Sequence, residues 1–407
     1  MKAAKATGGQ GEGTTAAMPQ RGRAPALGKR PQALFICGSI NQTSQMHAVA
    51  RELPDWEASF TPFYGDFFVD LLRRHRLAEM SIGGEKRRAW CLEYLRDHGL
   101  RLDMHGRRGG YDIVIHCTDV VVPKNVRGRP LVLVQEGIID RPGLWARAWE
   151  LAPWLPRWAA GTALTGRSGL FDRFCVASAG YRDFFVERGL DPKRLVVTGI
   201  PNFDDCAQYT RNEFPHRGYV LVCTSDVRET WRRDDRAGLV RRAVALAGGR
   251  PLVFKLHPNE NHTRAAAEIH AIAPSALVYA QGSAEHMIAN ADVVMTQWSS
   301  TVFVAAALGK EIHSDVPLEQ VRRLMPAQNG GRSARNIARV CREVLASSRA
   351  TPIGRTPEGS GRDETIDSKG ESAGVLHARR PIEGAASLRR VDPPAALGRG
   401  RRSGTSA

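Results

Sequence analysis

The chain has 407 residues, of which 42% are hydrophobic, and it carries a formal net charge of +16. This length is enough for two domains, and the apolar content is sufficient to fill two cores. No run of roughly eighteen apolar residues occurs, and residues 1–30 lack the apolar core of a signal peptide. We therefore expect a cytoplasmic protein, with peripheral contact at the inner face of the membrane left open.

The positive charge is concentrated toward the two ends of the sequence. Residues 1–32 and 351–407 carry about half of the excess, which leaves roughly +8 for the middle of the chain. The arginines are not interleaved with aromatic residues, as a groove for single-stranded nucleic acid requires. The charge therefore favours an anionic substrate or an anionic lipid surface, and we expect no nucleic-acid partner.

The seven cysteines are scattered, without a C-x-x-C pair, and several of them fall in apolar runs. This distribution predicts reduced thiols in the cores and no zinc site.

Composition divides the chain into five segments. Both ends are rich in small, polar and charged residues without apolar periodicity, which predicts disorder. The predicted segments are a basic tail at 1–31, a first domain at 32–200, a linker at 201–217, a second domain at 218–349 and a tail at 350–407.

In the first domain, short apolar runs alternate with amphipathic segments. The run 33–37 leads into a turn that contains Gly38 and then into a helix. This turn lacks G-x-G-x-x-G, so no dinucleotide fingerprint is present. The predicted strands are 33–37, 111–117, 130–134, 174–177 and 194–198, and the predicted helices are 44–52, 67–76, 86–98 and 181–188.

Two of these strands end in an acidic residue, Asp119 and Glu136. A carboxyl group partly buried beside a substrate has a raised pKa and serves in general acid or base catalysis. The alternatives are that Asp119 caps the following segment and that Glu136 pairs with Arg141 or Arg147.

Four tryptophans follow within a short stretch, at positions 145, 149, 154 and 158. They would line an acceptor groove, touch a membrane interface or pack in the core. The helical spacing of Trp145 and Trp149 favours core packing.

The second domain repeats the alternation of strands and helices, which predicts an α/β architecture of two doubly wound, Rossmann-like domains. Its predicted strands are 219–223, 251–256 and 291–296, and its predicted helices are 236–247, 263–272, 302–308, 320–325 and 333–347.

The three strands of this domain end in polar loops that should share one edge of the sheet. Backbone N–H groups and hydroxyls at a helix start suit a phosphate or diphosphate. The alternatives are that a serine only caps the helix and that the histidine is an ordinary loop residue. The candidate ligands of the diphosphate are Lys255, His257, Ser299, Ser300, Thr301, Ser225 and Arg228.

Two segments carry a resemblance to a known class of enzymes. Residues 255–258, Lys-Leu-His-Pro, and residues 296–301, followed by Ala-Leu-Gly-Lys at 307–310, resemble the HP and S motifs of GT-B transferases. These include the glycerophosphotransferases of teichoic-acid synthesis and bacterial capsule and sialyltransferases. The resemblance covers 32–315 and implies that His257 and the serine pair contact the nucleotide diphosphate, with Gly38, Ser39 and Asn41 on the acceptor side.

The topology is also similar to that of the non-hydrolysing UDP-N-acetylglucosamine 2-epimerases. The strand tips at Asp119 and at 135–137 match the acidic motifs of those enzymes only in part, and 225–229 and 297–300 depart from their other motifs. These departures favour a transferase over an epimerase.

The resemblance implies a transferase that moves a sugar or alditol phosphate from a nucleotide-activated donor to a saccharide or lipid-linked acceptor in polysaccharide or envelope synthesis. We expect it to use neither a metal nor a cofactor. Glu136, or else Asp119, would act as the base, and His257 would assist the leaving nucleotide. The alternatives are an isomerase that resembles the epimerases and a protein that binds nucleotide sugars without turnover.

Overall fold

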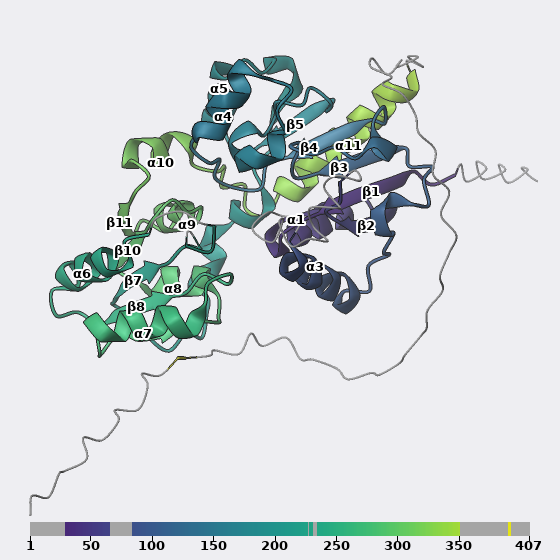
Figure 1. Ribbon diagram of the computed structural model, residues 1–407. Helices are drawn as coiled ribbons and strands as arrows, with labels where there is room; N and C mark the ends of the chain where they lie inside the picture. The colour runs from purple at the N-terminus through teal and green to yellow at the C-terminus, as the bar shows by residue number, and fades with distance from the viewer. Residues whose placement is uncertain (1–28, 66–83, 227, 231–233, 351–389, 392–407) are drawn as a thin grey trace, which may run out of the picture. The chain divides into compact units, whose positions relative to one another are not determined.

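The computed structural model describes residues 29–65, 84–226, 228–230, 234–350 and 390–391 (Figure 1). The helix predicted at 67–76 and nearly all of the two predicted tails lie outside these residues. Among the helices in the described ranges, none combines the length and the apolar character needed to cross a membrane.

The first sheet has six strands in the order β2-β1-β3-β4-β5-β6, and every neighbouring pair is parallel. Apart from His116, its two central strands consist of valine, isoleucine and leucine, as expected of parallel strands that are covered on both faces. The strands are β1 (Gln32–Cys37), β2 (Glu57–Pro62), β3 (Ile113–His116), β4 (Leu131–Val134), β5 (Arg173–Val176) and β6 (Leu195–Val197).

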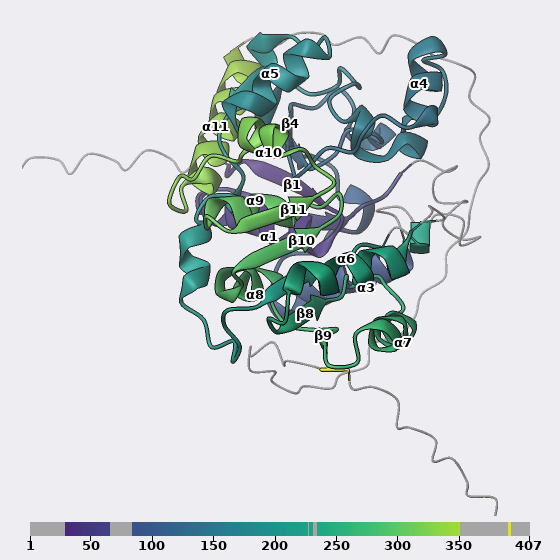
Figure 2. The ribbon, with the colours of Figure 1, turned by 90° about the vertical axis from the view of Figure 1, so that its left-hand side faces the viewer.

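The second sheet has five parallel strands in the order β11-β10-β7-β8-β9. Helix α9 packs on β10 and β11, and Figure 2 shows it beside both strands. The strands are β7 (Val220–Cys223), β8 (Leu252–Lys255), β9 (Leu277–Tyr279), β10 (Val293–Thr296) and β11 (Glu311–Ser314).

Crossovers through helices are why neighbouring strands run parallel. Of the ten α-helices in the described residues, eight lie between consecutive strands and two follow the last strand. They are α1 (Ile40–Arg51), α3 (Glu85–Asp97), α4 (Leu144–Leu151), α5 (Ala179–Glu187), α6 (Arg236–Ala247), α7 (His262–Ile272), α8 (Ala284–Asn290), α9 (Thr301–Ala307), α10 (Leu318–Leu324) and α11 (Ser333–Ala350). Short 3₁₀ segments include η3 (Arg157–Leu164), η5 (Pro201–Phe203) and η6 (Cys206–Thr210).

The last helix, α11, packs on the first sheet, beside β3 and β4 in Figure 1. Its apolar face joins the core formed by β1, β3 and β4, and Ile337 and Cys341 are fully buried there. Arg342 forms an ion pair with Asp55, which precedes β2. The sequence analysis placed this helix with the second domain at 218–349. The helix covers the first sheet instead, because an amphipathic pattern reveals an apolar face but not the sheet that it covers.

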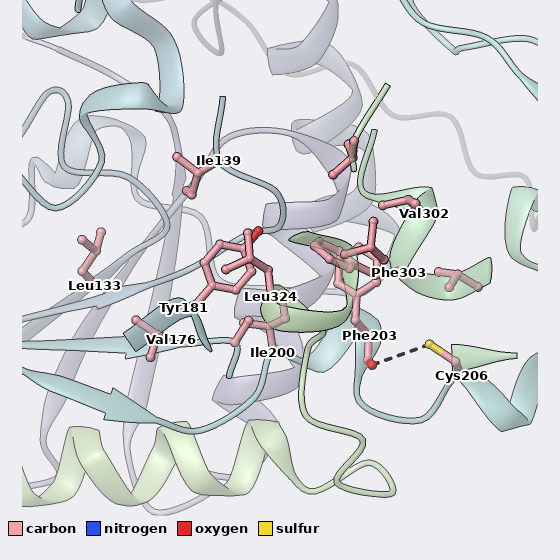
Figure 3. Packing of buried hydrophobic residues seen from close by; sticks show 14 of the residues in the cluster. Leu133, Ile139, Val176, Tyr181, Ile200, Phe203, Cys206, Val302, Phe303 and Leu324 are labelled. Atoms are coloured by element: carbon pink, nitrogen blue, oxygen red, sulfur yellow. Dashed lines mark hydrogen bonds between the residues drawn. The ribbon is translucent and has the colours of Figure 1, made fainter. Parts of the chain in front are cut away.

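The largest apolar core spans both sheets. Ile200 and Phe203 from the connecting segment join Tyr181 of α5 and Phe303 of α9 in this cluster (Figure 3). The Phe203 and Phe303 rings meet edge to face at 6.4 Å between centroids. All seven cysteines are buried and free.

Candidate functional site

Glu136 lies at the carboxyl end of β4, beside the first turn of α1. Its carboxylate accepts hydrogen bonds from the Ser39 hydroxyl (2.6 Å) and from Nε2 of Gln42 (2.5 Å). Ser39 is also the N-cap of α1. Parallel strands place their carboxyl ends at one edge of a sheet, which explains why residues so distant in sequence meet.

The alternative partners expected for Glu136 were Arg141 and Arg147. In the described part of the chain the carboxylate forms no ion pair, and its donors are neutral. A half-buried carboxylate without a cationic partner is suited to accept a proton.

The loop after β1 places two of the predicted acceptor-side residues, Gly38 and Ser39, close to Glu136. A Cβ at Gly38 would lie 2.1 Å from Oε1 of Gln42, so the side chain that holds Glu136 requires glycine there. The backbone oxygen of Asn41 accepts a hydrogen bond from Nδ2 of Asn202, which links this loop to the segment that connects the sheets.

Gly137, the residue after Glu136, lies directly against Ser300 of the second sheet. A Cβ at Gly137 would be 3.4 Å from Cβ and 3.6 Å from Oγ of Ser300. The strand tip that carries the candidate base therefore contacts the start of α9. Within the described residues, the Ser300 hydroxyl makes no hydrogen bond and does not cap the helix.

Ser299 precedes Ser300, the N-cap residue of α9, and its hydroxyl is already bonded at the start of the helix. Its hydroxyl accepts from the Thr301 backbone N–H (3.3 Å) and from the Thr301 hydroxyl (3.0 Å). Helix α9 has only seven residues. Its dipole contribution is correspondingly limited, and Ser300 is the hydroxyl that remains available for a ligand.

The side chain of Arg141, which follows β4, extends to Trp298, close in sequence to Ser300. The guanidinium of Arg141 lies 4.2 Å from the centroid of the Trp298 ring and donates to the backbone oxygen of Asp315 at 2.7 Å. A cation over an indole face is attracted by the negative face of the ring. We call the group of Glu136, Gly137, Arg141, Trp298 and Ser300 the sheet junction. Sequence reasoning missed Arg141 as a site residue, because no pattern indicates which loops of two sheets meet.

His257 follows β8, as predicted. Its Nδ1 accepts from the Asn259 backbone N–H at 3.2 Å, so Nε2 carries the proton of the neutral ring. Burial lowers the pKa of His257, although the Asp226 carboxylate 3.7 Å away opposes that effect. The ring is therefore a neutral hydrogen-bond donor at pH 7 and does not supply a positive charge.

A buried ionic network holds the loops after β7 and β8 in place. Glu260 accepts from Arg236 (2.5 Å), from the His257 backbone N–H (2.9 Å) and from the Thr224 hydroxyl. Arg236 is 4% exposed and also pairs with Asp234 at 3.1 Å.

The same network reaches the loop after β10. Gln297 donates to Asp234 at 3.1 Å and accepts from the Ser225 hydroxyl at 2.5 Å. The loops after β7, β8 and β10 are thus connected through side chains, and Ser225 is part of this network. The sequence analysis did not identify Asp234, Arg236 or Glu260, since their spacing matches no known motif.

Three predicted site residues, Lys255, Arg228 and Asp119, are bound to other groups of the protein. Lys255 is buried, and its ammonium donates to the backbone oxygens of Leu256 (2.7 Å) and Ala280 (3.3 Å). Burial lowers its pKa. The structure therefore does not bring Lys255 to the serine pair. A lysine at a strand end is equally able to satisfy nearby carbonyl groups, and sequence does not distinguish the two roles.

Arg228 and Asp119 also differ from expectation. Arg228 forms a two-point ion pair with Glu268 of α7, at 2.5 and 3.0 Å, so its charge is already neutralised. Asp119 is fully buried and accepts from the backbone N–H groups of Gly166 (2.7 Å) and Ser168 (2.9 Å). Asp119 thus anchors a loop, and it is not exposed to a substrate.

No cluster of three or more histidine, cysteine or acidic residues that would hold a metal ion is found among the residues that the structure describes.

The comparison with solved structures identifies the architecture. The UDP-GlcNAc 2-epimerase from Neisseria meningitidis, solved with UDP-GlcNAc bound, matches with a TM-score of 0.50, 11% identity, and coverage of 77% of this chain and 100% of that chain. A structure from Listeria monocytogenes assigned as a UDP-N-acetylglucosamine 2-epimerase matches with a TM-score of 0.50, 13% identity, and coverage of 80% and 98%. The chain has the GT-B fold.

A variant of the wall teichoic acid polymerase TagF also matches, with a TM-score of 0.43, 7% identity, and coverage of 79% of this chain and 90% of that chain. No protein-family model matches the sequence, and no curated protein matches it significantly. The predicted fold and the resemblance to GT-B proteins are confirmed, and the neighbours of this fold are enzymes.

Proposed function

We propose that the protein is a GT-B transferase that moves a sugar or alditol phosphate from a nucleotide-activated donor to a hydroxyl group of a saccharide or lipid-linked acceptor. The observation that carries this proposal is the contact of Gly137 with Ser300. Through this contact the residue that follows the Glu136 carboxylate, which neutral donors hold, lies against a serine with an available hydroxyl, and Arg141 lies over the nearby Trp298 ring.

In this proposal the donor diphosphate lies at Ser300 and Arg141. As the nucleotide leaves, negative charge develops on its phosphate oxygens, and fixed donors and cations there lower the barrier. The neutral His257 contributes a hydrogen bond from Nε2, and the protein's own groups take the part that a metal ion plays in other transferases.

Glu136 is the base in the proposed reaction. The acceptor hydroxyl binds near Ser39 and the turn at Gly38, and its oxygen forms the new bond to the transferred group. The bond to the nucleotide breaks, the nucleotide leaves with the electron pair, and the hydroxyl proton passes to the Glu136 carboxylate.

An isomerase of the epimerase type is the second candidate, since the proteins with matching folds include epimerases. Proton exchange at one sugar carbon needs two acids. The second acid offered by the sequence is Asp119, whose carboxylate is buried and bound to two backbone N–H groups. This observation favours the transferase.

A ligand screen followed by an isotope experiment tests the proposal. Donors that bind the folded chain raise its melting temperature, and UDP-linked compounds are tested first because a protein of the same fold is bound to UDP-GlcNAc. CDP-, GDP- and CMP-linked compounds follow. We expect one nucleotide class to stabilise the chain and to be consumed only with an acceptor.

Incubation with UDP-GlcNAc in deuterated water separates the candidates. Deuterium in the recovered sugar would contradict the transferase and support the isomerase. If a donor raises the melting temperature but is not consumed with any acceptor tested, the result supports binding without turnover.

A further inference from the structure

A cavity of about 390 Å³ lies in the first half of the chain, and none of the residues assigned to the sheet junction lines it. This volume falls within the range of small-molecule sites. It is lined by the loop after β3, the end of α4 and the segment that follows α4, namely Val120, Val121, Val122, Arg127, Trp149, Pro153, Leu155, Pro156, Arg157 and Trp158.

Trp149 lines this cavity and carries an unused hydrogen-bond donor. The residue is 9% exposed, and its indole Nε1 is buried without a partner among the described residues. An unpartnered buried donor costs free energy unless a ligand or water satisfies it. The donor therefore indicates an acceptor atom in the occupant.

Two arginines give the cavity a positive end. Arg127 and Arg157 both line it. Burial lowers the pKa of Arg157, the nearby Asp119 carboxylate opposes this effect, and the charge of Arg127 adds to it more weakly. In the described ranges, the Arg157 side chain makes no hydrogen bond and no ion pair. Two guanidinium groups that share a cavity are stabilised by an anion between them.

The remaining walls are apolar. Val120 to Val122 form one side, and the prolines and Leu155 form another. The adjoining surface continues this character, because Leu144, Leu151 and Trp154 are 85%, 87% and 82% exposed. Such a concentration of exposed large apolar side chains is unusual unless it serves binding.

We propose that this cavity binds a single-chain anionic amphiphile, with its acidic head at Arg157 and Arg127 and its alkyl or aryl part against Val120–Val122 and the Trp149 ring. The Trp149 indole N–H donates to an oxygen of the head. A phosphate head and a carboxylate head share this chemistry.

Titration calorimetry of the full chain with decyl phosphate, below the concentration at which it forms micelles, tests the proposal. Decanoate, decanol and inorganic phosphate are titrated in parallel, so that the head and the chain are assessed separately. We expect one decyl phosphate per chain, with decanol and inorganic phosphate each at least about tenfold weaker. If decanoate binds as tightly as decyl phosphate, the site accepts amphiphiles with either acidic head.

Three variants locate the binding. Arg157→Gln is expected to weaken decyl phosphate binding about tenfold, whereas Arg157→Lys retains most of it. Trp149→Phe keeps the aromatic wall and removes only the N–H, for an expected loss of several-fold. Val121→Trp fills the cavity and should abolish binding, whereas the same change at the exposed Val186 should leave it unaltered.

Each variant is compared with the parent by its melting temperature in the absence of ligand. Binding that is non-saturable, or equally strong in Arg157→Gln and Trp149→Phe, would contradict the proposal. Such a result would assign the amphiphile to the exposed surface of α4 instead.

Discussion

Ser39 and Glu136 lie 97 positions apart in the sequence, and the hydroxyl of the first donates a hydrogen bond of 2.6 Å to Oε1 of the second. The start of α1 thereby fixes the orientation of the carboxylate at the tip of β4. Because Ser39 and Gln42 are both neutral, the carboxylate is oriented without an ion pair. This arrangement favours a base over a structural ion pair, and it can be tested directly.

Replacing Glu136 with glutamine is expected to lower kcat by a factor of about 10² to 10⁴, with little change in donor affinity, because the amide cannot accept the acceptor's proton. Initial rates and donor binding are measured on the same preparation. Glu187→Gln, which alters an exposed ion pair with Arg323, is the control and should keep full activity. Loss of donor binding in Glu136→Gln would place Glu136 in the donor site instead.

Substitution of Gly137 tests the contact with Ser300. An alanine Cβ would lie at an ordinary contact distance, 3.4 Å from Cβ of Ser300, so Gly137→Ala should be tolerated. Gly137→Val adds methyl groups toward Ser300, and we expect donor binding to weaken about tenfold or more. Gly143→Val is the matched control, because a Cβ there meets nothing within 4 Å. Equal donor affinity in all three variants would rule out a donor site at Ser300.

Arg141 is the cation that the proposal assigns to the donor diphosphate. Arg141→Gln should raise the donor KM about tenfold or more and reduce its dependence on salt, because a charge-assisted contact is removed. Arg147→Gln, an exposed arginine of α4, is the comparison and should leave KM unchanged. A normal KM with a reduced kcat in Arg141→Gln would show that the cation acts only in the transition state.

We expect the folded protein to lose stability in acid because of the buried His116. It is fully buried in β3, neither ring nitrogen has a partner within the described residues, and burial lowers its pKa from 6.5 to about 3. Between these values the unfolded chain binds a proton that the folded chain does not. The free energy of unfolding should therefore fall by about 1.4 kcal/mol for each pH unit below 6.5, from this residue alone.

Urea denaturation from pH 7 to pH 4 measures this slope. His116→Leu removes the titrating group, so the variant should lose stability less steeply than the parent. His257 and His47, whose pKa values are also lowered by burial, leave a residual slope in the variant. Identical slopes in the two proteins would mean that His116 is hydrated in the folded state.

The buried pair of Arg236 and Glu260 should be important for stability. Glu260→Gln leaves a guanidinium that is 4% exposed with less charge to oppose it, and we expect a loss of roughly 3 kcal/mol in the free energy of unfolding. Glu187→Gln again serves as the exposed comparison and should change stability by less than about 0.5 kcal/mol. A similar small effect for both would indicate that Asp234 alone neutralises Arg236.

Much of the fold was predictable because parallel strands read as short apolar runs. The residues that end those runs were also predictable as site candidates, and Ser39 and Glu136 do meet. Three edge strands were not predicted. Strands β2 and β11 carry polar residues and lack a continuous apolar run, and β9 has only three residues.

The contacts that depend on how the two sheets pack were beyond the reach of sequence. Nothing in the spacing of Gly137 and Ser300, or of Arg141 and Trp298, indicates that they adjoin. Lys255 illustrates the converse, because its position at a strand end was predicted correctly and its side chain is directed to backbone carbonyls.

The return of α11 to the first sheet has a consequence for biosynthesis. The apolar surface formed by β1, β3 and β4 is completed by residues of α11, including Ile337 and Cys341. During translation that surface has no cover until this last helix leaves the ribosome, so the two halves cannot mature one after the other. Nascent chains that stall earlier would expose it to aggregation, and we expect them to depend on chaperones.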